Sequence, residues 1–384
     1  MENTTAVKRG PAAIWRICPG AHLVALIAAG IIGAFTALKG NAALMRKLSD
    51  EYIHPFHQRL AALTAKLPFS LAEFLYALAI GGTLVYIIIE LIRLIRRPER
   101  LRRLYRMLLR LLALGLSVYA GFCLLWGVYY YGDDFLAKSG LKSEAISGED
   151  LELVTLYFAD RLNAYGALVP RDDAGLCATD RGAVLARSST LYREIERRYP
   201  CLAGPEIPAK GMFFSRIMSI IDFTGFFCPF TAEANVNTDF PQALFAATVA
   251  HELSHQRGVA KEQEANFVAV LASLENGDPE SCYSACMLAY IHLGNALAGV
   301  DRAAYRLIYR GLSEGVRADL EENNRYWEQF ETPVQTATNA VYEGFLQSYD
   351  QTLGMRSYGA CVDLLVNYYR DSARACFGLP AGEK

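Results

Sequence analysis

Two histidines stand four residues apart, with a glutamate between them, in the stretch "VAHELSHQRGVAKEQEANF" from Val249 to Phe267. On a helix, residues four apart share a face, so His251 and His255 project side by side. Two imidazoles at this spacing can bind one Zn²⁺ ion, and Glu252 lies beside them, within reach of a water molecule on the metal. The spacing therefore predicts a zinc site with Glu252 as the general base of a hydrolytic reaction.

A hydrolytic zinc site has three protein ligands and an open position for water, so a third ligand is expected nearby. Glu262 and Glu264 are the candidates, and two residues apart on one helix they point in nearly opposite directions. Glu264 shares its face with apolar residues that should pack on the core: Phe267, Val268 and Leu271. We therefore expect Glu264 to be the third ligand, with Glu262 as the alternative. Both could instead be acidic residues of a solvated first helical turn, where they are favoured.

The residues around the motif predict the elements that position it. "NTDFPQALF" offers Asp239 as the N-cap of the histidine helix with Pro241 in its first turn, and Gly258 is a stop signal soon after His255. The preceding stretch "GFFCPFTAEANVN", Gly225 to Asn237, is rich in aromatic residues and contains Pro229, which does not suit a long helix. We expect a strand or hairpin there.

The N-terminal third contains three long apolar segments. Ile17 to Leu38, Phe74 to Ile89 and Leu111 to Gly132 carry no Asp, Glu, Lys or Arg. A helix needs about 20 apolar residues to cross a hydrocarbon core. The second segment reaches that length if Ser70 is its N-cap and Glu73 completes a capping box, which predicts a helix from Ser70 to about Ile92. We expect three membrane helices, and no cleaved signal peptide.

Basic residues predict the orientation of these helices. The N-terminus and the link between the second and third helices carry 11 Lys and Arg, against five in the link between the first and second. The positive-inside rule puts the N-terminus in the cytoplasm and the C-terminal domain outside. Trp126 and Tyr129 to Tyr131 are then expected in an outer aromatic belt. The arginine-rich link between the second and third helices is expected to bind anionic lipid rather than nucleic acid.

Charge divides the chain into a membrane anchor, residues 1–132, and an outer domain, residues 133–384, which has 22 basic and 34 acidic residues. A domain with a net charge of −12 is a poor nucleic-acid binder. The fold class expected is mainly α, with a small sheet. The helices expected in the outer domain are 147–165, 181–198, 241–257, 262–275, 282–297, 302–309, 311–329, 333–352 and 358–375.

"HELSHQRG" followed by "EANF" resembles the gluzincin group of zinc peptidases, in which two histidines and a downstream helical glutamate hold the metal. With the three apolar segments, "PFTAEANVN" and "SYGACVDLL", the chain also resembles an uncharacterised bacterial family of membrane-bound zincin-like proteins, classified as a domain of unknown function (number 3810). The resemblance covers nearly the whole chain and implies a zincin-like α+β metallopeptidase domain. It also implies that Phe230 to Asn237 is the edge strand that pairs with an extended peptide substrate.

The expected function is a membrane-anchored zinc peptidase at the outer face of the cytoplasmic membrane, acting on a peptide or protein. A further donor should stabilise the oxyanion of the transition state. Tyr358 is our candidate, and Arg356 and His292 are alternatives; a structural role is open for each.

Two other functions are compatible with parts of the sequence. An intramembrane protease is disfavoured, because the uncharged stretch before His251 is too short to span a bilayer. The alternative is a catalytically silent sensor or scaffold that binds peptides or cell-envelope components. Glu252 counts against it, because a silent site has no need of a base.

Overall fold

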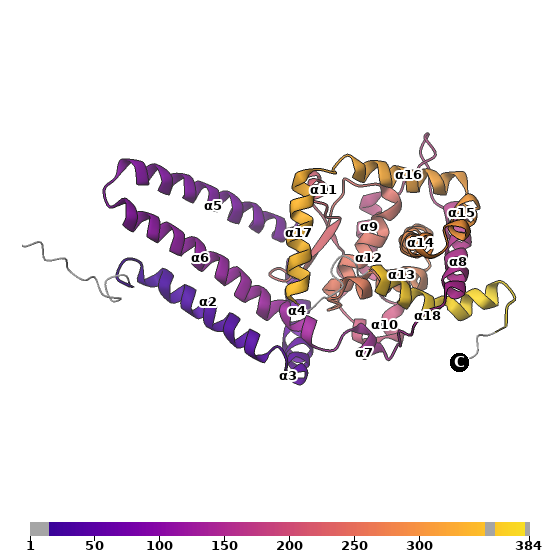
Figure 1. Ribbon diagram of the computed structural model, residues 1–384, viewed down its shortest axis with the longest axis horizontal. Coiled ribbons are helices and arrows are strands. Elements are labelled where there is room, and N and C mark those ends of the chain that lie inside the picture. Colours follow the sequence, from indigo (N-terminus) through magenta and orange to yellow (C-terminus); the bar gives the residue numbers. More distant parts are fainter. Residues whose placement is uncertain (1–14, 350–357, 381–384) are drawn as a thin grey trace, which may run out of the picture.

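A computed structural model describes residues 15–349 and 358–380 of the 384-residue chain. Three long apolar helices extend from one side of a body that is mainly helical and contains one small sheet (Figure 1). The mainly α fold class expected from the sequence is therefore confirmed.

The three apolar helices are α2 (Pro19–Leu38), α5 (Leu71–Arg96) and α6 (Arg100–Leu125), and each is long and apolar enough to cross a membrane. Ser70 caps α5 as expected, since its Oγ accepts the backbone N–H of Glu73 at 2.9 Å. Helix α6 begins at Arg100, eleven residues before the uncharged segment, because the arginine-rich link continues the helix. The helix therefore carries basic side chains on its first turns and apolar ones beyond them.

The segment between α2 and α5 folds onto the body. It comprises α3 (Ala42–Lys47), a π-helical turn (Leu48–Ile53) and α4 (His54–Thr64). His57 Nε2 donates to the carbonyl oxygen of Pro229 at 3.1 Å, and Thr64 Oγ1 donates to that of Thr231 at 3.1 Å. This segment thus joins the two parts that the sequence divides at residue 132.

The body is built around α14 (Pro279–Val300), which packs against α8 (Gly148–Gly166), α12 (Phe245–Gln256), α13 (Glu262–Asn276) and α18 (Tyr358–Cys376). Large side chains that are almost fully buried fill the space between these helices: Phe158, Tyr192, Phe267, Tyr283 and Tyr290. The remaining helices are α7 (Phe135–Ser139), α9 (Arg181–Arg187), α10 (Ile195–Arg198), α11 (Ser215–Ile220), α15 (Arg302–Arg310), α16 (Glu314–Glu328) and α17 (Pro333–Ser348).

The sheet has three strands in the order β1 (Lys210–Gly211), β3 (Glu233–Val236), β2 (Gly225–Cys228). Strands β2 and β3 form the antiparallel hairpin expected from the sequence, and β1 pairs with β3 in parallel. Because β3 has a neighbour on both sides, the expectation that Phe230 to Asn237 forms the substrate-binding edge is wrong. Within the described residues, β2 is the strand with an unpaired edge beside the histidine helix.

The polar side chains of β3 hold the start of α5. The two carboxylate oxygens of Glu233 accept the backbone N–H groups of Leu71 at 3.1 Å and Ala72 at 2.7 Å. Lys210 Nζ donates to Glu233 Oε1 at 2.6 Å, and Ser70 Oγ donates to Asn235 Oδ1 at 2.6 Å. These buried contacts fix the first turn of an apolar helix to the centre of the sheet, and a helix N-terminus favours a carboxylate there.

The aromatic residues expected in an outer belt pack against the protein to different extents. Trp126 and Tyr129 are each only 6% exposed and pack with Phe35, Met45 and Tyr349. A short 3₁₀ turn, Gly127–Tyr131, directs these side chains into the junction between the apolar helices and the body. The belt expectation is therefore wrong for Trp126 and Tyr129, because tertiary contacts remove these two rings from the lipid side, whereas Tyr130 and Tyr131 are half-buried against the same cluster.

Candidate metal centre and pocket

Helix α12, which carries the two histidines, is almost entirely buried. It begins at Phe245 after a 3₁₀ turn, Gln242–Leu244, and Asp239 is not its N-cap, because the Asp239 carboxylate binds Arg216 instead. The expected stop is confirmed: Gly258 has a φ of +85° and donates its N–H to the carbonyl oxygen of His255 at 2.9 Å. The buried faces of α12 give the motif a fixed position, and His251 remains partly exposed to the pocket.

The two imidazole rings are held with their Nε2 atoms together. His255 Nδ1 lies 2.7 Å from the carbonyl oxygen of Val259, and His251 Nδ1 lies 2.8 Å from Asn266 Oδ1. Since both partners are oxygens that accept, each Nδ1 donates its proton, which leaves Nε2 as the atom for a ligand. The two Nε2 atoms are 3.0 Å apart.

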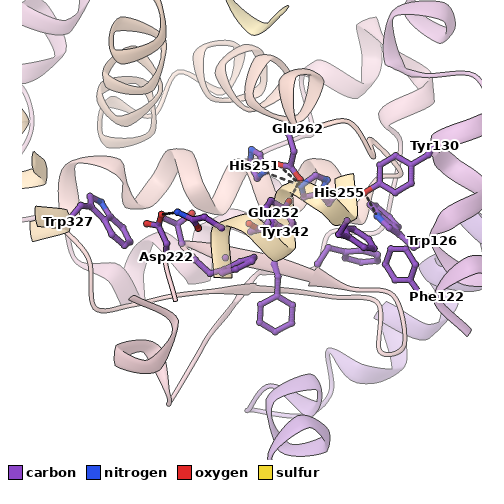
Figure 2. Close-up of a pocket in the computed structure, with 17 residues that line it drawn as sticks. Phe122, Trp126, Tyr130, Asp222, His251, Glu252, His255, Glu262, Trp327 and Tyr342 are labelled. Carbon is purple, nitrogen blue, oxygen red and sulfur yellow. Dashed lines mark hydrogen bonds and ion pairs between the residues drawn. The ribbon is translucent and has the colours of Figure 1, made fainter. Parts of the chain in front are cut away.

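Glu262, at the start of α13, completes this cluster. Its Oε2 lies 3.2 Å from His251 Nε2 and 3.6 Å from His255 Nε2. One ligand atom from each of the three residues falls within 4.8 Å of the others, which is the separation that a single metal ion requires. Figure 2 shows Glu262 above the two rings, with dashed lines joining it to them.

Glu264, the expected third ligand, faces elsewhere. It is 2% exposed, and its carboxylate accepts the backbone N–H groups of Phe135 at 2.8 Å and Leu136 at 3.5 Å, at the start of α7. Burial raises the pKa of Glu264 to about 7. Glu264 does lie on the core face of α13, as the sequence indicates, but the histidines pack against another face. The expectation that Glu264 lies beside the two histidines is therefore wrong, and Glu262 lies there instead.

Glu252 extends from α12 toward β2. It is 3% exposed, and its Oε2 has no hydrogen-bond partner among the described residues. Burial raises the pKa of its carboxyl group to about 7, although the nearby histidines oppose the shift. A Cβ atom on Gly225 would lie 2.5 Å from Glu252 Oε1, so the backbone of β2 approaches the carboxyl group as closely as glycine allows.

The cluster has the charge pattern of a cation site. Burial alone would lower the pKa of His255, but the Glu262 carboxylate outweighs burial and raises that pKa to about 9. Burial would raise the pKa of Glu262, yet His255 and His251 hold it well below its ordinary value. A positive charge is thus stabilised where the three ligand atoms meet.

Tyr342 on α17 is a site residue that sequence reasoning missed. Its hydroxyl donates to Glu262 Oε1 at 2.9 Å, so Oε2 is the oxygen that faces the histidines. Burial and the Glu262 carboxylate raise the pKa of Tyr342 well above 10, so the hydroxyl keeps its proton. Its sequence neighbourhood contains no motif, and only its contact with Glu262 in the folded chain reveals it.

The structure describes the side chain of one of the three candidate oxyanion donors. Tyr358 is the first residue of α18, but its side chain lies outside the described residues, as does Arg356. His292 on α14 is 6% exposed, and burial lowers its pKa to about 4.

A pocket of about 440 Å³ contains the cluster. Its walls come from α6 and the following turn, from β2, and from α17. The residues that line it are mostly aromatic beyond the ligand cluster, among them Phe122, Trp126, Tyr130, Phe226, Phe227 and Phe345. In Figure 2, the two histidines and Glu252 lie between Trp327 and Asp222 on one side and Phe122, Trp126 and Tyr130 on the other. The pocket therefore extends to both sides of the cluster.

The chain was compared with known proteins and families. No curated protein and no solved structure matches it significantly. A family model described as "Protein of unknown function (DUF3810)" matches residues 50–366, which include α5, α6, the sheet and every residue of the candidate metal cluster. Since the match covers well over half of the sequence, the chain belongs to the DUF3810 family.

Proposed function

We propose that this protein is a membrane-anchored zinc peptidase of zincin-like fold, acting at the outer face of the cytoplasmic membrane. The observation that carries the proposal is the convergence of His251 Nε2, His255 Nε2 and Glu262 Oε2 in a pocket that also contains the buried carboxyl group of Glu252. This is the set of residue types that a hydrolytic zinc centre needs.

The residues fit a zinc ion by their chemistry. Both imidazoles have Nδ1 engaged with an oxygen acceptor, which is the usual arrangement for zinc-binding histidines. The third ligand atom is a carboxylate oxygen whose partner oxygen is occupied by Tyr342, so its direction is fixed. Three protein ligands leave a fourth position for water, as in catalytic rather than structural zinc sites.

A bound zinc ion would lower the pKa of a water molecule and polarise the scissile carbonyl group of the substrate. Glu252 would accept the proton of the attacking water and then donate it to the leaving amine. Its raised pKa of about 7 suits both tasks, because a base with a pKa near ambient pH can also act as the acid. Gly225 leaves the space that the carboxyl group needs.

The free edge of β2 would bind the substrate backbone. Asn237 donates its N–H to the carbonyl oxygen of Thr224 at 2.9 Å, which extends the β2–β3 ladder by one pair. Residue pairs of an antiparallel ladder alternate between hydrogen-bonded and non-hydrogen-bonded pairs, and Gly225 and Phe227 belong to the second kind. Their backbone N–H and C=O groups therefore point away from β3. An extended peptide can pair with these groups, and the aromatic walls would receive its side chains.

The side of the membrane is part of the proposal. It is supported by the 11 basic residues of the N-terminus and of residues 93–110, where α5 ends and α6 begins, against five in residues 39–66, together with three apolar helices. The candidate cluster lies on α12 and α13, outside these helices, which argues against an intramembrane protease.

The test uses the full-length protein in lipid nanodiscs, because α6 contributes to the pocket wall. Wild type should contain one zinc ion per chain and hydrolyse a degenerate peptide pool, whereas Glu252→Gln should retain the zinc and lose hydrolysis. Absence of zinc from wild type would contradict the proposal. If Glu252→Gln and wild type gave the same products, a catalytic role for Glu252 would be excluded. If wild type bound peptides through the pocket without cleaving them, the sensor or scaffold alternative would be supported.

A further inference from the structure

Exposed apolar side chains of the body gather near the outer ends of the apolar helices. Beyond residue 132, the described large hydrophobic residues that are exposed number eleven, and six of them lie at α11 or on α17: Phe213, Phe214, Ile217, Ile220, Val334 and Val341. Clusters of this kind mark a surface that is covered by a partner or by lipid.

Helix α17 has an outer face without charge. Val334 and Val341 are 55% and 74% exposed, and the helix contains a single charged residue, Glu343. The preceding helix, α16, carries seven charged residues in its 15 positions. A water-exposed helix is normally charged on its outer face, so the composition of α17 indicates an apolar environment.

Helix α11 and the two residues before it present a similar surface. Phe213 is 85% exposed, the largest value in the body for such a residue. The backbone N–H groups of Phe213 and Phe214 donate to the two oxygens of Glu73, in the first turn of α5, at 2.9 and 2.6 Å. The two phenylalanines therefore stand beside the point at which α5 begins.

Both surfaces lie at the level where the apolar helices end. Phe345 of α17 packs against Phe122 of α6 with ring centroids 5.2 Å apart, and the following Tyr349 contacts Phe122 and Phe35 of α2. Near the middle of α17, Asn339 donates to Asp222, just after α11, at 2.9 Å. Figure 1 shows α17 running along the boundary between the apolar helices and the body, with α11 near its upper end.

We propose that α11 and α17 rest in the membrane–water interface, so that the pocket opens at the lipid surface and receives polypeptide segments presented there. An interfacial helix places its apolar face among lipid headgroups, and the membrane helices α5 and α6 hold α11 and α17 at that depth. The pocket wall formed by α6 brings the site to the same level. The placement of α11 and α17 in the interface is independent of the proposed peptidase function. The proposed substrate class rests on that function.

The placement is tested by spin labelling of full-length protein in nanodiscs of phosphatidylethanolamine and phosphatidylglycerol. Val341→Cys and Phe213→Cys are compared with Leu307→Cys, which is 70% exposed on α15, on the side of the body away from the apolar helices (Figure 1). All three variants are made in a protein in which the exposed Cys376 is replaced by Ser, and this protein without an added cysteine gives the background labelling. The labels at positions 341 and 213 should be more accessible to collisions with oxygen than with a water-soluble nickel chelate. The label at position 307 should be more accessible to the nickel chelate. Equal nickel accessibility at all three positions would overturn the placement.

The substrate class is tested with one degenerate peptide pool in two forms, N-terminally palmitoylated or acetylated. Val341→Glu should slow cleavage of the palmitoylated pool and leave the acetylated pool unchanged, whereas Leu307→Glu should affect neither. An equal effect of Val341→Glu on both pools would overturn presentation from lipid. If wild type cleaved neither pool while the labels at 341 and 213 lay in lipid, the proposed peptidase function would fail and the interfacial placement would stand.

Discussion

The carboxyl group of Glu252 lies against the backbone of Gly225, so closely that a Cβ atom there would stand 2.5 Å from Oε1 and 2.7 Å from Cδ. The general base proposed for the reaction is therefore positioned by the strand that is proposed to bind substrate. Any side chain at position 225 must displace the base.

Gly225→Ala should reduce hydrolysis by about 100-fold or more, because misplacing a general base removes its contribution. Zinc content should stay at the wild-type level, since residue 225 contacts no proposed ligand atom. Gly299→Ala is the matched control, because a Cβ there meets nothing within 4 Å. Zinc analysis and peptide hydrolysis are measured on both variants, and full activity of Gly225→Ala would contradict the assigned role of Glu252.

Glu262→Ala and Glu264→Ala should differ in kind. Glu262→Ala removes a proposed ligand, so the zinc affinity should fall by orders of magnitude. Glu264→Ala should retain zinc but lower the free energy of unfolding by about 1 to 3 kcal/mol, because two buried N–H groups at the start of α7 lose their acceptor. Zinc titration and chemical unfolding of both variants measure the contrast. Zinc loss confined to Glu264→Ala would restore the expectation from the sequence.

Zinc binding should release a proton. In the metal-free protein, the raised pKa of His255, about 9, means that its ring holds a proton below that pH. The ion must replace this proton, so the apparent zinc affinity should rise about tenfold per pH unit from pH 7 toward 9 and level off above it. Competition with a chelator of known affinity across this range provides the measurement. A flat profile would show that His255 is neutral in the metal-free protein.

The attachment of α5 to the sheet should contribute strongly to stability. Glu233→Ala leaves Lys210 and two helix N–H groups without their carboxylate, so the free energy of unfolding should fall by about 3 to 5 kcal/mol. Glu206→Ala, which removes an exposed ion pair with Arg193, should leave it nearly unchanged. Thermal unfolding in detergent compares the two. Similar stability of both variants would mean that the sheet does not depend on α5.

The topology can be tested with a thiol that the chain already has. Cys376 is exposed near the end of α18, and Leu101→Cys would add a thiol at an 85% exposed position at the start of α6. A membrane-impermeant maleimide should label Cys376 in intact cells and reach position 101 only after lysis. The opposite pattern would place the metal cluster in the cytoplasm.

Which face of α13 meets the histidine helix could not be predicted from the sequence. The expectation that Glu264 shares the core face of α13 with apolar residues is confirmed, because its side chain is buried. Which glutamate lies beside the histidines, however, depends on where α12 packs, and α12 meets the face of α13 that carries Glu262 and Asn266. Asn266, one turn after Glu262, was a signal for this face, since a polar side chain there can hold a zinc-binding histidine.

Features that depend on local periodicity could be predicted from the amino-acid sequence alone. These are the three apolar helices, the shared face of His251 and His255, the β2–β3 hairpin and the stop at Gly258. Four features followed only from the packing of distant elements. Glu262 is the glutamate that joins the histidines, β2 rather than β3 has the free edge, Tyr342 orients Glu262, and α6 forms a wall of the pocket. The physical reason is that helix and strand periods fix the direction of a side chain relative to its own element, whereas its partners depend on how elements distant in sequence pack together.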